Sequence, residues 1–148
     1  MSLRTPIYFS VEEMVCPHVY NKFKGNEKMI WNFFDPRLLI TLDWIREMLN
    51  SPITVNNWKE GGPFSQRGLR CNICPLVKEK TAKNSVYVSS HILGQAVDFD
   101  VKGMQASEVR AWLYDNKDVL PYPISVEKDV NWVHLDMRCL GNDNFYLF

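Results

Sequence analysis

Two short runs in the second half of the chain alternate between apolar and polar residues, and this alternation restricts the fold more than any other feature. The runs cover residues 96–101 and residues 132–137. Successive side chains of a strand point to opposite faces, so a period of two predicts strands with one apolar and one polar face. The polar positions carry acids in both runs and a histidine in the second. We therefore expect a sheet that buries one face in a core and presents the other as the floor of a site.

Two helix starts can be recognised in the first third of the chain. Ser10 and Glu13 have the spacing of a capping box, which predicts a short helix that ends before Pro17. Asp35-Pro36 predicts an N-cap followed by proline at the first helical position. Leucine and isoleucine then recur at helical spacing, which predicts an amphipathic helix over residues 36–50.

The remaining elements are shorter. Residues 53–55 and 124–127 have strand character, residues 58–70 have the composition of a polar, glycine-rich loop, and Ser107 is the expected cap of a helix over roughly residues 108–116. Early helices followed by a cluster of strands predict an α+β domain. We expect its sheet to be antiparallel, with the helices packed on one face.

Charge and composition exclude two classes of partner. Lysine plus arginine total 17 and aspartate plus glutamate total 17, so nothing favours binding to nucleic acid. No apolar stretch is long enough for membrane insertion. Residues 1–6 lack the basic region and apolar run of a secretory signal, so we expect a protein that is cytoplasmic until it is released. The length of 148 residues predicts that residues 1–148 form a single domain.

Four cysteines are present, and without a secretory signal they favour reduced thiols over disulfides. Cys71 and Cys74 have CxxC spacing, and Cys16 and His18 could complete a structural zinc site with them. Because no second CxxC is present and Cys139 stands alone, free and partly buried thiols are the stronger interpretation. The structural zinc site remains an alternative.

The residues that can bind a catalytic metal are few. The chain has three histidines, and two of them, His91 and His134, lie beside predicted strands with polar faces. Asp98 adds a carboxylate, and two histidines with one carboxylate make an open zinc site that leaves one position for water. On spacing alone, His91 could equally be a loop histidine and His134 a half-buried strand histidine.

The residues around these positions change the interpretation. Residues 89–98, SSHILGQAVD, fit the pattern SxHxxGxAxD, and residues 132–136 read WVHLD. The two motifs, in this order, resemble the family of D-Ala-D-Ala carboxypeptidases and L-alanyl-D-glutamate peptidases, whose fold is shared by the hedgehog signalling domain. The resemblance covers roughly residues 36–138 and is strongest to phage and prophage-type members. It implies a hedgehog/DD-peptidase-like fold and a zinc peptidase that acts on bacterial peptidoglycan.

The resemblance also implies roles for individual residues. The family's ligands of one catalytic zinc ion map onto His91, Asp98 and His134. The family's serine maps onto Ser89, which would support a ligand from behind. The family's arginine holds a substrate carboxylate or carbonyl and maps best onto Arg70, with Arg67 as a rival because it stands where serine is usual.

The general base has two candidates. Some members place a glutamate three residues before the second histidine, where this chain has Asn131, whereas hedgehog-like members place one on the preceding strand, where Glu127 lies. If residues 128–131 form the hairpin loop, Glu127 lies opposite Trp132 and diagonal to His134. Asp136 is the alternative, either as the base or as the residue that orients the histidine.

The implied activity is zinc-dependent hydrolysis of peptide bonds in peptidoglycan stem peptides, as a carboxypeptidase or an endopeptidase of the endolysin type. Because no secretory signal is recognised, we expect such a protein to reach the cell wall only after release or holin-type export. Two further readings remain open. One is a hedgehog-like zinc-binding module without peptidase activity, since a fold does not determine a function. The other is a small interaction domain built on a structural zinc at the cysteines.

Overall fold

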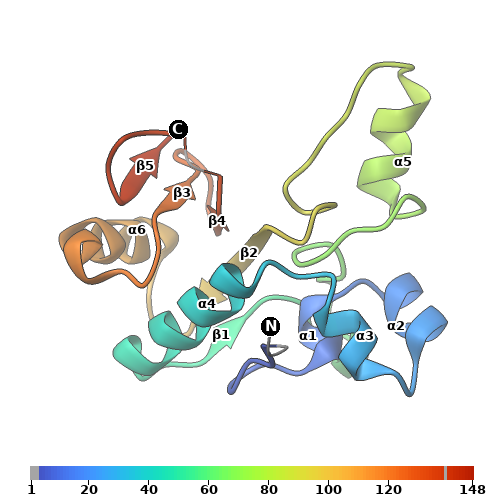
Figure 1. Cartoon of the computed structure of the whole chain (residues 1–148), viewed down its shortest axis with the longest axis horizontal. Helices are drawn as coiled ribbons and strands as arrows, with labels where there is room; N and C mark the ends of the chain where they lie inside the picture. Colours follow the sequence, from blue (N-terminus) through green and yellow to red (C-terminus); the bar gives the residue numbers. More distant parts are fainter. Residues whose placement is uncertain (1–3, 139) are drawn as a thin grey trace.

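The chain is described from a computed structural model that covers residues 4–138 and 140–148 (Figure 1). The helices are α1 Val11–Met14, α2 Pro17–Phe23, α3 Glu27–Trp31, α4 Pro36–Leu49, η1 Trp58–Glu60, α5 Pro75–Ala82, α6 Ala106–Asp115 and η2 Lys117–Val119. The strands are β1 Ile53–Thr54, β2 Ala96–Val101, β3 Ile124–Val126, β4 Val133–Asp136 and β5 Phe145–Leu147. Cys139 lies outside the described residues. None of the described helices is both long and apolar enough to cross a membrane.

The fold is α+β, as predicted, but the sheet is mixed rather than antiparallel. Its strand order is β1-β2-β4-β3-β5. The first three pairings are antiparallel, while β5 runs parallel to β3 with Phe145 beside Ile124. The sequence did not predict β5, because only three residues form it and they have no alternating pattern around them. The hedgehog/DD-peptidase arrangement itself stays an expectation.

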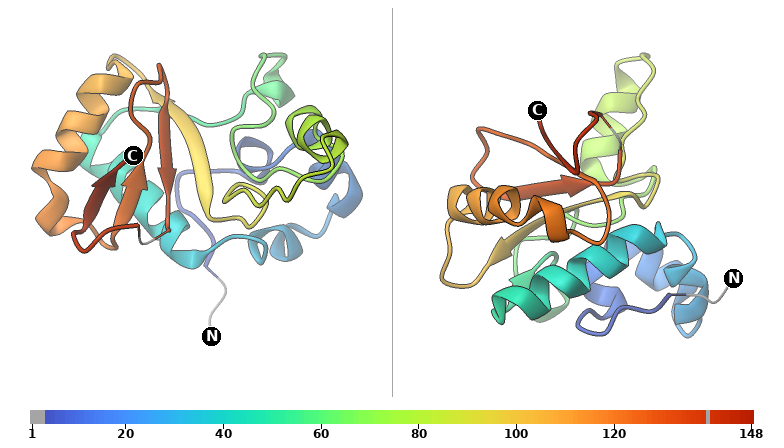
Figure 2. Two further views of the ribbon diagram at one scale, coloured as in Figure 1. Left: turned by 90° about the horizontal axis from the view of Figure 1, so that it is seen from above. Right: turned by 60° about the vertical axis from the view of Figure 1, so that its left-hand side comes forward.

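Helix α4 lies across one face of the sheet, as all three views show (Figures 1 and 2). It starts as predicted, with Asp35 accepting a hydrogen bond from the Arg37 N–H at 2.9 Å and Pro36 at the first position. The apolar faces of α4, α6, β2 and β4 share one core. The Trp44 and Trp112 rings, with centroids 5.6 Å apart, join α4 to α6. This packing leaves the polar faces of β2 and β4 on the other side.

Helix α6 begins earlier than predicted. Gln105, and not Ser107, is its N-cap, and the Gln105 N–H donates to the Glu108 carboxylate at 2.6 Å. Ser107 is a better N-cap residue in isolation, but the reciprocal contact requires a glutamate three residues after the cap, and only Gln105 has one. The capping box at Ser10 was predicted correctly, and its N–H donates to Glu13 at 2.9 Å.

Three α-helices and the two short 3-10 helices, η1 and η2, were not predicted. α2 and α5 each begin at the proline of a Cys-Pro pair, with Cys16 and Cys74 as N-caps, and α3 follows Asn26. All of them are eight residues or shorter, which is too short for a clear helical period. As a result, the segment between β1 and β2 contains η1 and α5 in addition to the expected loop, and α5 projects from the rest of the molecule in Figure 1.

Candidate functional site

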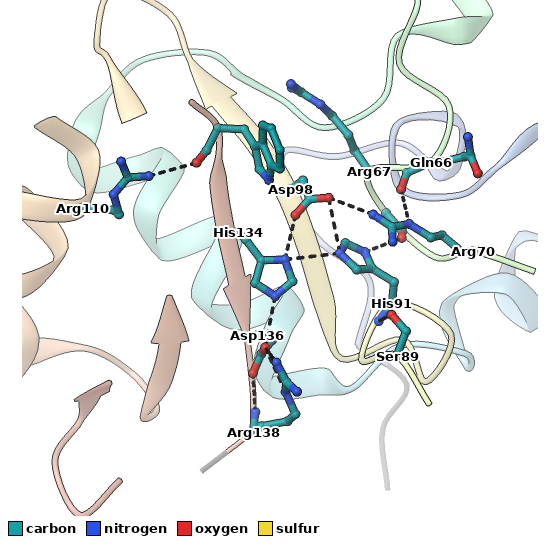
Figure 3. A network of polar contacts seen from close by, with 12 residues as sticks. Gln66, Arg67, Arg70, Ser89, His91, Asp98, Arg110, His134, Asp136 and Arg138 are labelled. Atoms are coloured by element: carbon teal, nitrogen blue, oxygen red, sulfur yellow. Dashed lines mark hydrogen bonds and ion pairs between the residues drawn. The ribbon is translucent and has the colours of Figure 1, made fainter. Parts of the chain in front are cut away.

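The polar face of β2 and β4 brings two of the predicted ligands together. The strands pair antiparallel with Asp98 directly opposite His134. Residues opposed in this way project from the same face, with Cβ atoms about 4.5–5.5 Å apart. Figure 3 shows the two side chains turned toward each other, and His134 Nδ1 lies 2.7 Å from Asp98 Oδ1. The alternation in the sequence is therefore enough to place this pair.

His91 reaches the same point from a tight turn just before β2. Gly94 in this turn has a φ of +67°, and a β-carbon there would overlap the carbonyl oxygen of Phe33. The Asp35 N–H donates to the Gly94 carbonyl at 3.0 Å, which ties the turn to the start of α4. Only glycine tolerates both the backbone angle and the close approach. The glycine of the motif thus sets where His91 enters the site.

The ligand atoms of the three residues converge at distances that fit a metal. His91 Nε2 lies 3.3 Å from His134 Nδ1 and 3.3 Å from Asp98 Oδ2. In a tetrahedral shell with zinc–ligand distances of about 2.0–2.1 Å, neighbouring nitrogen and oxygen atoms are about 3.3–3.4 Å apart. His134 Nδ1 contacts the other oxygen of the same carboxylate, Asp98 Oδ1, at the hydrogen-bond distance of 2.7 Å. All three side chains are buried. We call this group, His91, Asp98 and His134, the His–Asp site.

The outer contacts of both imidazoles turn electron pairs toward the centre. His91 Nδ1 lies 2.9 Å from the Gly68 carbonyl, which can only accept, so Nδ1 carries a proton and Nε2 presents its lone pair. His134 Nε2 lies 3.1 Å from Asp136, whose carboxylate also accepts from Arg138 at 2.5 and 3.0 Å. His134 Nε2 therefore carries a proton, and its Nδ1 faces the centre. Contacts of this kind fix the tautomer and orientation of metal-binding histidines.

The charges at the site favour a positive charge at its centre. Burial disfavours the carboxylate of Asp98, but hydrogen bonds from His134 and His91 hold the pKa of Asp98 well below its usual range. Burial also disfavours the imidazolium of His134, yet hydrogen bonds to Asp136 and Asp98 raise the pKa of His134 to about 9. A proton on His134 Nδ1 thus lies between His91 Nε2 and the Asp98 carboxylate, which can only accept hydrogen bonds. A divalent cation can take the place of this proton.

The two arginines predicted as substrate ligands lie in different positions relative to the His–Asp site. Arg70 Nη2 donates to Asp98 Oδ2 at 3.0 Å, and its Nε donates to the Gln66 carbonyl at 2.5 Å. Arg67 instead pairs with Asp100 at 2.5 Å and stacks over the Phe64 ring, so its guanidinium points away from the His–Asp site in Figure 3. The structure therefore brings Arg70 to the site. Its role in holding substrate remains a prediction.

Ser89 acts on the turn and not on an imidazole ring. Its Oγ accepts a hydrogen bond from the backbone N–H of His91 at 3.2 Å. This contact holds the turn in the conformation that carries the histidine. The predicted role of Ser89 as a supporting residue stays a prediction, and the sequence did not indicate that the serine contacts the backbone of His91.

Glu127 lies closer to His134 than predicted. The strand register pairs Val126 with Leu135, and the Glu127 N–H donates to the His134 carbonyl at 3.2 Å. Glu127 is therefore directly opposite His134, and the expectation that it lies opposite Trp132 is wrong by two residues. The connection between β3 and β4 contains six residues instead of four, because β3 ends at Val126, one residue earlier than predicted, and β4 begins at Val133, one residue later than predicted.

An open cavity of about 360 Å³ gives access to the site. Glu127 and Arg70 line it together with the His–Asp site, and so do Trp132, Arg138 and Phe148. The sequence placed Trp132 and Arg138 on the same polar face as His134, but it predicted no role for either of them. Phe148 gave no signal, because it reaches the cavity through the unpredicted β5.

Asp136 occupies a different position from Glu127. It is fully buried, and its oxygens accept from His134 Nε2, from two guanidinium nitrogens of Arg138 and from the Arg138 backbone N–H at 2.9 Å. Burial opposes this charge, but the hydrogen bonds from His134 and Arg138 lower the pKa of Asp136. With its oxygens engaged in this way, Asp136 is placed to orient His134 rather than to accept a proton from water.

A second group of possible metal ligands lies elsewhere in the molecule. Cys16, His18, Cys71 and Cys74 converge, with ligand atoms within 4.8 Å of one another. The three described thiols are free and buried or partly buried, as expected, and their convergence with His18 gives the alternative of a structural zinc site its geometry. The sequence could not decide this, because 53 residues separate His18 from Cys71.

Comparisons of the chain with models of protein families, with curated proteins and with solved structures gave no significant match. The resemblance to the peptidase family therefore rests on the two motifs themselves.

Proposed function

We propose that this chain is a zinc-dependent peptidase that hydrolyses peptide bonds in peptidoglycan stem peptides. One observation carries the proposal: three buried ligand atoms with outward-facing hydrogen-bond partners converge at the floor of an open cavity that also contains a carboxylate and a guanidinium. The metal chemistry is supported by this geometry. The substrate class is supported by the resemblance of residues 89–98 and 132–136 to the peptidase motifs.

The residues divide the work of hydrolysis in a simple way. A zinc ion held by His91, Asp98 and His134 would supply a Lewis acid that polarises the scissile carbonyl and acidifies a water molecule. Glu127, on the same face and directly opposite His134, accepts the proton of the attacking water and returns it to the leaving amine. The half-buried position of Glu127 in the cavity wall suits a group that must meet both water and substrate.

Substrate orientation falls to the guanidinium groups at the cavity. Arg70 is fixed by bonds from Nε and Nη2, which use two of its five N–H donors. A substrate carboxylate or carbonyl can take further donors of the same planar fork. Because the same guanidinium contacts Asp98, Arg70 couples the position of the substrate to that of a metal ligand.

Purified muropeptides provide the direct test. We expect the full-length protein loaded with zinc to release a shortened stem peptide, detected by mass spectrometry, and a chelator to stop the release. The variant His134→Ala should be inactive even with added zinc. Bound zinc without any cleavage of carboxypeptidase or endopeptidase substrates would refute the peptidase proposal and favour a binding module. Cleavage that survives both the chelator and His134→Ala would refute the role of the His–Asp site.

A further inference from the structure

The group of Cys16, His18, Cys71 and Cys74, here called the Cys–His cluster, brings four ligand atoms within 4.8 Å of one another, and three of them have the spacing of one face of a tetrahedral metal site. The Cys71 and Cys74 sulfurs lie 3.7 Å apart, and His18 Nδ1 lies 3.5 Å from Cys71 Sγ and 3.8 Å from Cys74 Sγ. Zinc bonds of about 2.3 Å to sulfur and 2.0–2.1 Å to nitrogen give tetrahedral edges of about 3.8 Å between sulfurs and about 3.6 Å between sulfur and nitrogen. All three distances agree with these edges to within a few tenths of an ångström.

The backbone around each segment fixes the positions of the ligands in the Cys–His cluster. Cys16 and Cys74 are both buried N-caps followed by proline, so the rigid starts of α2 and α5 set where their sulfurs point. The Cys74 N–H donates to the Cys71 carbonyl at 3.1 Å, which closes the CxxC turn. His18 is exposed and offers Nδ1 from the first turn of α2. The four ligands thus come from two short, well-formed segments.

We propose that the Cys–His cluster binds a structural zinc ion, separate from the His–Asp site, through three thiolates and one imidazole. Three sulfurs and one nitrogen with no carboxylate or open side are typical of structural zinc, whereas catalytic sites keep three protein ligands and an open position. Soft thiolate ligands select zinc over magnesium or calcium. The resemblance to the peptidase family supplied no part of this assignment, because its motifs contain none of the four residues.

The bound ion would fasten together two segments that lie far apart in the sequence. Between them, the Leu69 N–H donates to the Met14 carbonyl at 2.8 Å, and the Cys16 N–H donates to the Leu69 carbonyl at 3.3 Å. Gly68 packs so closely on Met14 that a β-carbon would overlap the Met14 carbonyl. Within residues 56–95 the buried apolar residues are Leu69, Cys74 and Val77, so a metal–ligand set is an effective way to fix this connection to the N-terminal helices.

The fastened segment also supports the His–Asp site. The carbonyl of Gly68 is the acceptor for His91 Nδ1, and the Arg70 N–H donates to the His91 carbonyl at 3.3 Å. Residues 68–70 therefore lie between the two groups of ligands and contact both. Structural zinc would hold the acceptor that orients His91.

Metal content in a variant without the His–Asp site gives the test. His91→Ala/His134→Ala, purified under reducing conditions, should retain one zinc ion per chain, with X-ray absorption showing three sulfur ligands at about 2.3 Å and one nitrogen. Cobalt in place of zinc should give a thiolate-to-metal charge-transfer band. A variant without bound zinc, or a disulfide between Cys71 and Cys74 in the freshly purified chain, would overturn the proposal. Neither result depends on peptidase activity, so failure here and failure of the proposed function are distinguishable.

Exchange of a single ligand gives a second test, which remains informative if the double variant does not fold. His18→Cys should keep zinc and replace nitrogen by sulfur in the absorption spectrum. Loss of a residue that only contacts a ligand typically weakens metal binding by about 10–100-fold. His18→Ala removes a direct ligand, so it should weaken zinc binding by more than that. His18 is exposed, so neither change disturbs the core. Equal zinc affinity in wild type, His18→Cys and His18→Ala would exclude His18 as a ligand and overturn the proposed site.

Discussion

Glu127 and Asp136 are two carboxylates on one face of the sheet, and replacing each by its amide should have opposite consequences. Glu127→Gln changes a half-buried group in the cavity wall, opposite His134. Asp136→Asn changes a fully buried group that contacts His134 Nε2 at 3.1 Å and Arg138 at 2.5 Å. The first side chain can reach a water in the cavity, whereas the second is held behind the histidine.

The magnitudes follow from these positions. Loss of a general base lowers the rate by about 10²–10⁴-fold, or about 2.7–5.4 kcal/mol in activation free energy, and glutamine should leave the zinc ligands in place. Loss of a carboxylate that orients a ligand weakens metal binding by about 10–100-fold, or about 1.4–2.7 kcal/mol. Asparagine at position 136 keeps one acceptor oxygen, but it puts an amide N–H₂ where His134 and Arg138 already donate. We therefore expect a cost toward the upper end of that range.

Two assays on the same preparations separate the effects. Zinc affinity is measured by competition with a chromophoric chelator, and hydrolysis of muropeptides is measured at saturating zinc. Glu127→Gln should bind zinc like wild type and be nearly inactive, while Asp136→Asn should lose zinc more readily and recover part of its activity when zinc is added. Glu47→Gln, an exposed change on α4, serves as the control and should match wild type. If Glu127→Gln keeps most of its activity and Asp136→Asn is inactive with zinc fully bound, the assignment is reversed.

Three further predictions concern stability and are measured by denaturant unfolding. Asp35→Ala should lower the free energy of unfolding by about 0.5–2 kcal/mol at neutral pH, because it removes the cap of α4. Burial opposes the charge of Asp35, but hydrogen bonds from Arg37 lower its pKa. The stabilisation is therefore present above the unfolded pKa of about 3.9 and should disappear as pH falls through the folded pKa. An unchanged difference between wild type and variant at pH 7 and pH 2 would contradict this. Asp43→Ala should cost about 1–3 kcal/mol, since its carboxylate accepts from the Ile7 N–H at 2.9 Å, and an unaltered midpoint would argue against that anchor. Gly94→Ala should cost more than about 1 kcal/mol and also weaken zinc binding, while Gly103→Ala, with a similar φ but open space, should lower stability alone.

The parts of the fold that were predicted depend on local signals. The alternation in β2 and β4 identified both strands and the faces of Asp98 and His134, because a period of two is a property of the strand itself. The start of α4 was equally local, since Asp35-Pro36 satisfies the helix end without any distant partner. The outcome at Ser107 shows the limit of such signals. Ser107 is a good cap residue, but the helix begins at Gln105 because Glu108 lies three residues after it and completes the capping box.

What could not be predicted depends on contacts between distant segments. The register that puts Glu127 opposite His134 is set by where β3 and β4 stop pairing, and the sequence allowed more than one turn length there. The parallel pairing of β5 brings Phe148 to the cavity, and no pattern of residues announces it. The Cys–His cluster is a stronger case. CxxC spacing gave two ligands, but only the folded chain shows that Cys16 lies next to them.

The position of His91 explains why a small domain of this kind benefits from a second group of ligands. Asp98 and His134 are opposed across two paired strands, so the sheet fixes both to within the tolerance that a metal requires. His91 comes from a turn, and its ring direction depends on the Gly68 carbonyl, which belongs to a long connection rather than to the sheet. Ordering such a connection costs about 1–2 kcal/mol for each residue fixed, and here few buried apolar side chains offset that cost.

Metal binding at the Cys–His cluster would supply the missing free energy at the one place where the connection meets the N-terminal helices. On this argument the cluster determines how well the third ligand is held, and zinc affinity at the His–Asp site should fall by about 10–100-fold in Cys71→Ser/Cys74→Ser, an expectation that rests on the proposed zinc site.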